Sequence, residues 1–218
     1  MSPFPQKLID GYRTFASQRL PTEQSRYREL SERGQAPEVM VIGCCDSRVS
    51  PEVIFDAGPG ELFVVRNVAN LVPVYAPDGG AHGVSAALEY AVNALRVKHV
   101  VVLGHAQCGG IRAFIDKIEP LSPGDFIGRW MSMFIKPGEK VEQRDQETMA
   151  EFTVRVEKAA IFRGLENLMT FPFVRTRAAS GKLSLHGAYF GVAEGSLFVL
   201  DKAAKEFRGV LQQPRMAD

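Results

Sequence analysis

The chain has 218 residues, of which 45% are hydrophobic and 23% are charged. This length and composition predict one globular domain with a large core and exclude an intrinsically disordered protein. The 26 Lys and Arg residues nearly balance the 25 Asp and Glu residues, so we expect neither nucleic acid nor a membrane as a partner.

The first 33 residues predict a helical arm. Leu8 and Tyr12 lie at helical spacing, and Pro21 opens a second helix that stops at Gly34. Such an arm has few neighbours in its own sequence. We expect it to pack on the body of the domain or on a second copy of the chain.

From Val39 onward the pattern is that of an α/β fold. Short apolar runs typical of buried strands alternate with helical segments, one of which begins at Pro51 and another of which spans residues 84–95. Residues 143–170 predict a charged helix that Pro172 ends. The expected strands are Val39–Gly43, Leu62–Val65 and His99–Gly104, followed by a late strand pair, Leu183–Val192 and Leu197–Leu200.

We therefore predict a single α/β domain over residues 1–218. Its core, residues 34–201, is expected to hold about four parallel strands plus the late strand pair, flanked by helices. The arm precedes this core, and residues 202–218 are interpreted as a C-terminal tail.

Two chemically distinctive segments follow predicted strands. Cys44 follows one strand, and His105 and Cys108 follow another. Because the carboxyl ends of parallel strands meet in one crevice, these residues are expected to be neighbours. Two thiolates and one imidazole suit zinc, and three protein ligands leave a fourth position for water. Such a site lowers the pKa of the bound water to about 7 and is typical of catalytic zinc.

Each residue alone has an ordinary interpretation. A lone buried cysteine is usually a small hydrophobic residue, and an isolated His-x-x-Cys recurs by chance. The joint occurrence of both segments after two strands favours the metal site. The other three histidines, which have no cysteine at ligand spacing, are interpreted as structural: His82, His99 and His186.

Residues beside the expected ligands suggest further roles. Asp46 and Arg48 can form a carboxylate–guanidinium pair, whose ordinary interpretation is a weak surface ion pair. Beside zinc, a free carboxylate would take the open position, whereas a paired one could accept a hydrogen bond from the bound hydroxide. Gly109 opens a helix whose positive end favours anions. Cys45 does not occupy the ligand position of its segment. A disulfide between the adjacent Cys44 and Cys45 in an oxidised sample is the alternative.

The sequence closely resembles the β-class carbonic anhydrases. Cys44–Arg48 matches that family's CxDxR and His105–Cys108 its HxxC, and residues 59–70 and 185–187 resemble further family segments. The resemblance implies reversible hydration of CO₂ to bicarbonate and a proton. It also implies one Zn²⁺ per subunit on Cys44, His105 and Cys108, an Asp46–Arg48 catalytic dyad, and paired subunits whose N-terminal helices embrace each other.

The resemblance also suggests a substrate pocket of the open, plant-like kind, in which Asp46 is only a conditional fourth zinc ligand. The bicarbonate-inhibited subset tends to have a Trp and a Tyr where this chain has Val41 and Phe190, although Arg66 is present. The plant-like subset has pocket residues that correspond to Gln35, Phe63, Val68 and Tyr90. For each of these, an ordinary loop or core role is the alternative.

Two other functions stay open. One is a hydrolase of carbonyl sulfide or carbon disulfide, which shares the motifs. The other is a non-enzymatic structural zinc module or a thiol redox sensor that uses Cys44 and Cys45. Three cysteines, an odd number, together with an N-terminus that lacks signal-peptide features, lead us to expect a reducing, cytoplasmic location.

Overall fold

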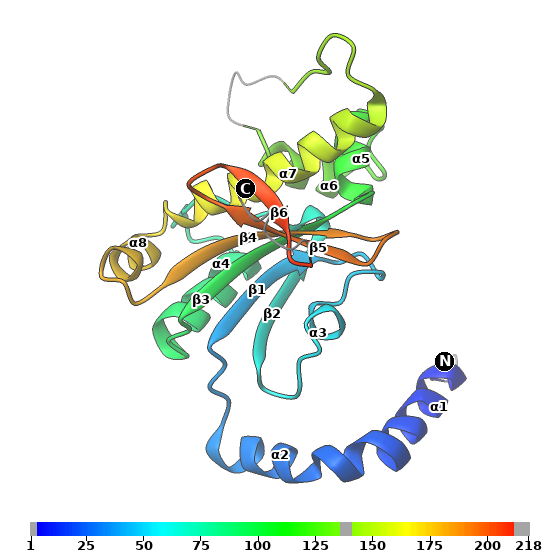
Figure 1. Cartoon of the computed structure of the whole chain (residues 1–218), viewed down its shortest axis with the longest axis vertical. Helices are drawn as coiled ribbons and strands as arrows, with labels where there is room; N and C mark the ends of the chain where they lie inside the picture. Colours follow the sequence, from blue (N-terminus) through cyan, green and yellow to red (C-terminus); the bar gives the residue numbers. More distant parts are fainter. Residues whose placement is uncertain (1–3, 136–140, 212–218) are drawn as a thin grey trace, which may run out of the picture.

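The computed structural model describes residues 4–135 and 141–211. Its centre is a six-stranded sheet with the strand order β2-β1-β3-β4-β5-β6 (Figure 1). The strands are β1 (Val39–Cys44), β2 (Leu62–Asn67), β3 (His99–His105), β4 (Ser184–Gly191), β5 (Ser196–Asp201) and β6 (Glu206–Gly209).

The predicted α/β class is confirmed. Strands β2, β1, β3 and β4 are parallel, and β5 and β6 continue the sheet in antiparallel fashion. The first strand of the expected late pair therefore has two roles, since β4 is the fourth parallel strand and also the partner of β5.

Helices connect and cover these strands. They are α1 (Gln6–Thr14), the π-helical turn η1 (Phe15–Arg19), α2 (Leu20–Arg33), α3 (Pro51–Ile54), the short 3₁₀ turn η2 (Val68–Asn70), α4 (Gly83–Glu89), the π-helical turn η3 (Tyr90–Ala94), α5 (Gly109–Ile115), α6 (Phe126–Ser132), α7 (Met149–Leu168) and α8 (Pro172–Ala179). Among the described residues, no helix is both long and apolar enough to cross a bilayer.

The two faces of the sheet are covered unequally. On one face, Met40, Ile42 and Val102 form a core with buried residues of α4, η3, α7 and α8. On the other face, Val41 and Leu103 are buried, and Ile54 of α3 packs beside them. Several neighbouring side chains on this second face are only half-buried: Val39, Leu62, Val64, Val101 and Leu197.

Helix α7 begins later than the sequence pattern indicated. Residues 141–148 are not helical, and the helix starts after Thr148, whose side chain accepts from the Glu151 backbone N–H. The Glu151 side chain in turn accepts from the backbone N–H of Thr148, which completes a capping box. The continuous charge pattern of residues 143–170 did not reveal this start. Pro172 follows α7, as expected, and is also the first residue of α8.

Part of the predicted C-terminal tail belongs to the sheet. Strand β6 lies within residues 202–218 and pairs with β5 through a tight turn, in which Asp201 accepts from the backbone N–H groups of Ala203 and Ala204. Four residues are too few for a periodic pattern to reveal a strand.

The predicted helical arm extends away from the rest of the chain (Figure 1). None of the residues of α1 and α2 is buried. Helix α2 ends at Arg33, and the next residue, Gly34, has a φ of 79°, which favours glycine. The arm meets the body at the 58–60 turn, where Arg26 Nε donates to the Pro59 carbonyl at 3.3 Å.

Helix α7 packs very close to the sheet because glycines face it. A Cβ added at Gly187 of β4 would lie 2.8 Å from Ile161 Cγ2, and one at Gly104 of β3 would lie 2.8 Å from Ile161 Cδ1. The helix itself contributes Gly164, which lies against Val102. This close packing sets the distance from α7 to the carboxyl ends of β3 and β4.

We predict that Gly187→Ala lowers the free energy of unfolding by about 1–3 kcal/mol, because the new methyl group would overlap Ile161 in a filled core. Chemical denaturation monitored by circular dichroism measures the change. Gly83→Ala is the matched control, since nothing lies within 4 Å of its added Cβ. Equal stability of the two variants would contradict the packing argument.

Candidate active site

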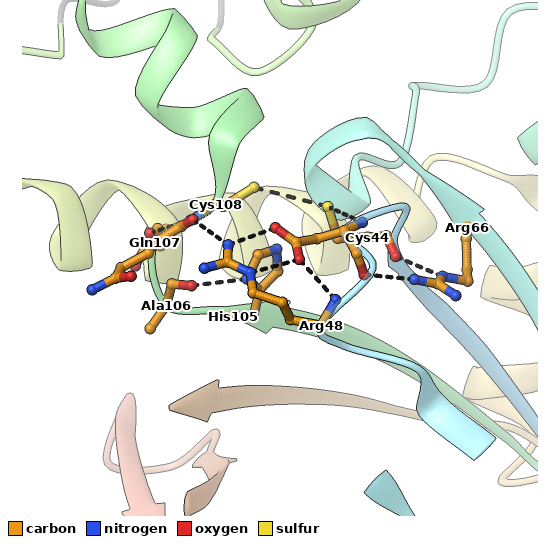
Figure 2. A network of polar contacts seen from close by, with 9 residues as sticks. Cys44, Arg48, Arg66, His105, Ala106, Gln107 and Cys108 are labelled. Atoms are coloured by element: carbon orange, nitrogen blue, oxygen red, sulfur yellow. Dashed lines mark hydrogen bonds and ion pairs between the residues drawn. The ribbon is translucent and has the colours of Figure 1, made fainter. Parts of the chain in front are cut away.

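The three predicted metal ligands come together at the carboxyl ends of β1 and β3 (Figure 2). Cys44 ends β1, His105 ends β3, and Cys108 directly precedes α5. Their ligand atoms lie within 4.8 Å of one another, and the two sulfur atoms are 3.9 Å apart. All three residues are buried, with 5%, 1% and 1% of their surface exposed.

The orientation of His105 suits a metal ligand. Its Nδ1–H donates to the Ala106 carbonyl at 2.9 Å, so in the neutral imidazole Nε2 carries the free lone pair, within 4.8 Å of both sulfur atoms. Nε2 is buried and has no hydrogen-bond partner in the described part of the chain. A buried nitrogen without a partner is costly, and a metal ion would satisfy it.

The geometry of the three donors fits zinc. Two Zn–S bonds of about 2.3 Å at a tetrahedral angle place their sulfur atoms about 3.8 Å apart, close to the observed separation. Apolar side chains of α5, α6 and α7 pack around both cysteines. The three protein ligands leave room for a fourth, exchangeable one.

The two thiols influence each other's ionisation. A hydrogen bond from Cys108 lowers the pKa of Cys44 to about 4, despite its burial. The same contact, together with burial, raises the pKa of Cys108 well above its usual range. The two thiols therefore share a proton, and zinc, which binds thiolates, would displace it.

Asp46 and Arg48 form the predicted pair. The Arg48 Nε and Nη2 donate to the two carboxylate oxygens at 2.9 and 2.6 Å, and the Arg48 backbone N–H donates to Oδ1 at 3.0 Å. These bonds hold the pKa of Asp46 far below its ordinary value, so the carboxylate is ionised throughout the neutral range. Arg48 also donates to the Gln107 carbonyl at 3.0 Å.

Arg66 supports the backbone of the metal loop. Its guanidinium donates to the Cys44 and Asp46 carbonyls, both at 2.7 Å (Figure 2). The sequence indicated Arg66 only as a component of an inhibitory bicarbonate pocket. In the structure its Nε and one terminal nitrogen hold the Cys44–Asp46 backbone in place.

Sequence reasoning missed one buried acid at the site. Glu157 of α7 is 2% exposed and accepts a hydrogen bond from the Cys108 backbone N–H at 2.9 Å. Burial raises the pKa of this carboxyl, while its hydrogen bonds oppose the shift. The only sequence signal is an acid at a core-facing position of the 143–170 helix.

The predicted substrate residues fall into two groups. Val68 lies next to the metal loop, because a Cβ added at Gly110 would be 2.7 Å from Val68 Cγ1. Gly109 is the first residue of α5, directly after Cys108, and nothing lies within 4 Å of its added Cβ.

The other three substrate residues are not beside the metal ligands in the same chain. Gln35 precedes β1 at its amino end, the opposite end from Cys44. Phe63 lies four residues before Asn67, the β2 partner of Cys44, which is about 13 Å along the strand. The Tyr90 ring packs against Phe63 at 5.9 Å between centroids.

The remaining cysteine and histidines lie outside the metal group. Cys45 is exposed and is not a member of the three-residue group. His82 Nε2 lies 2.6 Å from Asp78 Oδ1, and His99 Nδ1 lies 3.2 Å from His186 Nε2. These positions agree with the structural interpretation of the three histidines.

Comparisons with known proteins identify this arrangement. The family model described as "Carbonic anhydrase" matches residues 39–197. A carbonic anhydrase from Synechococcus elongatus is 31% identical over 209 residues, which are 95% of this chain and 76% of that protein. The chain belongs to the β-carbonic anhydrase family.

Further relatives agree with this assignment. Beta carbonic anhydrase 5 of Arabidopsis thaliana, a chloroplastic protein, is 37% identical over 77% of this chain, which spans 55% of the plant protein. The solved β-carbonic anhydrase CcaA aligns with a TM-score of 0.85 and 28% identity, covering 97% of this chain and 93% of that one. A tetrameric β-carbonic anhydrase from Sordaria macrospora aligns with a TM-score of 0.75 and 28% identity. The alignment covers 90% of this chain and 96% of that one.

This family membership determines the activity and the cofactor. The protein is a carbonic anhydrase, a zinc-dependent lyase that interconverts CO₂ and bicarbonate. The structure provides a buried group that fits the ion, Cys44, His105 and Cys108.

We predict one zinc ion per chain, lost in Cys44→Ser and retained in Cys45→Ser. The two cysteines are adjacent, but only Cys44 belongs to the buried ligand group. Elemental analysis of purified, folded protein measures the zinc content. Loss of zinc in Cys45→Ser with retention in Cys44→Ser would show that the ligand assignment is wrong.

Proposed function

We propose that the chain hydrates CO₂ reversibly at the Cys44–His105–Cys108 site, with Asp46 and Arg48 as its catalytic dyad. The observation that carries this proposal is the pairing of Asp46 with Arg48 directly beside a buried group of three zinc-binding residues. Bound zinc supplies a Lewis acid that makes water a nucleophile near neutral pH.

The dyad orients the reacting water and protects the metal. Asp46 is ionised and can accept a hydrogen bond, while Arg48 occupies both of its oxygens from the other side. This pairing would keep the carboxylate from binding a metal ion held by the three ligands. Asp46 is therefore only a conditional ligand, and it competes for the metal when Arg48 releases it.

Val68, next to the metal loop, would offer an apolar surface to CO₂, and the Gly109 backbone, at the start of α5, would face the anionic product. CO₂ has no charge and needs only a small apolar surface. Bicarbonate needs donors, and the side-chain amide of the predicted residue Gln35 would provide one.

We infer that the protein works as a homo-oligomer of at least two chains. The arm has no buried residue in α1 or α2, and apolar side chains on the second face of the sheet are only half-buried. Leu8 and Tyr12 of the arm are exposed, so both surfaces present apolar side chains that a partner would cover. The Sordaria macrospora relative is described as tetrameric.

The same inference explains the separated substrate residues. Gln35, Phe63 and Tyr90 lie toward the far end of β1 and β2 from Cys44 in their own chain. A second copy would bring its own Gln35, Phe63 and Tyr90 to this metal site. Each active site would then be built from two chains.

We also propose a reducing location such as the cytoplasm and a role in carbon utilization. The exposed Cys45, next to the zinc ligand Cys44, would oxidise readily elsewhere. If the purified enzyme kept full zinc and activity after prolonged exposure to an oxidised glutathione buffer, this argument for compartment would fail.

Arg48→Ala is expected to lower CO₂ hydration by about 100-fold or more, because the freed Asp46 competes for the metal. Stopped-flow assays on zinc-quantified protein measure the rate, and thermal unfolding in parallel tests the fold. Wild-type turnover in a folded Arg48→Ala protein would disprove the dyad role. Hydrolysis of carbonyl sulfide without CO₂ hydration by the wild type would favour the alternative enzyme.

Mixed oligomers test whether two chains build each site. We expect inactive Arg48→Ala chains and weakened Gln35→Ala chains, co-expressed with different tags and purified as hetero-oligomers, to regain a large part of wild-type activity. One of the two sites would then hold neither substitution. Sedimentation should show at least a dimer, and activity no higher than the mean of the two parents would contradict the shared site.

A further inference from the structure

One peptide group in the metal loop is hydrogen-bonded at both ends to charged side chains. Its carbonyl, that of Gln107, accepts from Arg48 Nη2 at 3.0 Å. Its N–H, that of Cys108, donates to Glu157 Oε1 at 2.9 Å. This single peptide therefore lies between the dyad and a buried acid.

Glu157 is itself held in place. Its second oxygen, Oε2, accepts from the Tyr189 hydroxyl of β4 at 2.7 Å, and Tyr189 is 4% exposed. Both oxygens are thus acceptors, which is the pattern of an ionised carboxylate. The close approach of α7 to β4 at Gly187 brings these two residues within reach.

Satisfying one N–H does not require a carboxylate. A neutral carbonyl or amide would do so without the cost of burying a charge, which is several kcal/mol for an unpaired ion. Unlike a neutral acceptor, the carboxylate also polarises the peptide group to which it is hydrogen-bonded. Hydrogen bonds in a chain strengthen one another, so a negative group at the N–H end makes the Gln107 carbonyl a better acceptor for Arg48.

The backbone conformation agrees with a loop that needs external support. Gln107 has a φ of 56°, in the left-handed region that non-glycine residues rarely adopt. Arg48 and Glu157 bond to the peptide that follows this residue. Removing either bond would free the loop that carries Cys108.

We propose that Glu157 is a positioning residue that couples the zinc ligand Cys108 to the Asp46–Arg48 dyad through the Gln107–Cys108 peptide. Tyr189 orients its carboxylate. The inference rests on the proposed function for its effect on turnover, but its effect on zinc binding does not depend on the reaction.

Glu157→Gln in the zinc-loaded enzyme tests this coupling, because it retains size and one acceptor but removes the charge. We expect zinc to dissociate about 10- to 100-fold faster into a chromogenic chelator, with CO₂ hydration reduced by a similar factor. Tyr189→Phe should have the same effects to a smaller degree. Glu147→Gln is the matched control, since Glu147 is also mostly buried and charge-paired, with Arg155, away from the metal loop.

A spectroscopic readout separates positioning from general stability. With ¹⁵N-labelled cysteine, the three cysteines of the chain yield three amide signals. We expect the Cys108 amide proton to move upfield in Glu157→Gln and, less, in Tyr189→Phe, but not in Glu147→Gln. Should Glu157→Gln fail to fold, Tyr189→Phe carries the same comparison.

The coupling to Arg48 has its own test in zinc release. If both groups act through one peptide, Glu157→Gln should accelerate release several-fold less in an Arg48→Ala background than in the wild type. Additive effects would contradict the coupling. The proposal is overturned if folded Glu157→Gln releases zinc at the wild-type rate and its Cys108 amide signal does not move. This holds even when the wild-type enzyme hydrates CO₂ normally.

Discussion

The active site depends on the parallel pairing of β1 with β3. Their register places Ile42 opposite Val102, so the two strands end within one residue of each other and bring Cys44 and His105 together. Parallel pairing leaves the strand carboxyl ends free for loops, and Cys108 follows in the loop that starts α5. A slip by one residue would turn every side chain to the other face and separate the ligands.

Around this point, the chain uses charges to hold backbone rather than substrate. Arg66 binds the carbonyls of Cys44 and Asp46, Arg48 binds the Gln107 carbonyl, and Glu157 binds the Cys108 N–H. Each contact fixes a loop that carries a zinc ligand or the dyad. The site is therefore preorganised by side chains from β2, from the loop after β1 and from α7, which lie far apart in the sequence.

Local motifs made the metal ligands and the dyad predictable, because Cys44, Asp46 and Arg48 are close in sequence, as are His105 and Cys108. Strong apolar runs likewise revealed the parallel strands. Glu157 could not be predicted, since it is 49 residues from Cys108 and reaches it only through the packing of α7 on the sheet. The short strand β6 has no periodicity of its own. The proposed roles of Gln35, Phe63 and Tyr90 would depend on a second chain, which no local pattern describes.

The most direct test of this account is the zinc coordination of the wild-type enzyme near pH 8, seen by crystallography with anomalous scattering at the zinc edge. The account predicts zinc on the sulfur atoms of Cys44 and Cys108 and on His105 Nε2, with water or a small anion as the fourth ligand and Asp46 still paired with Arg48. Zinc bound directly by Asp46, with bicarbonate beside Arg66, or zinc bound by Cys45, would contradict it.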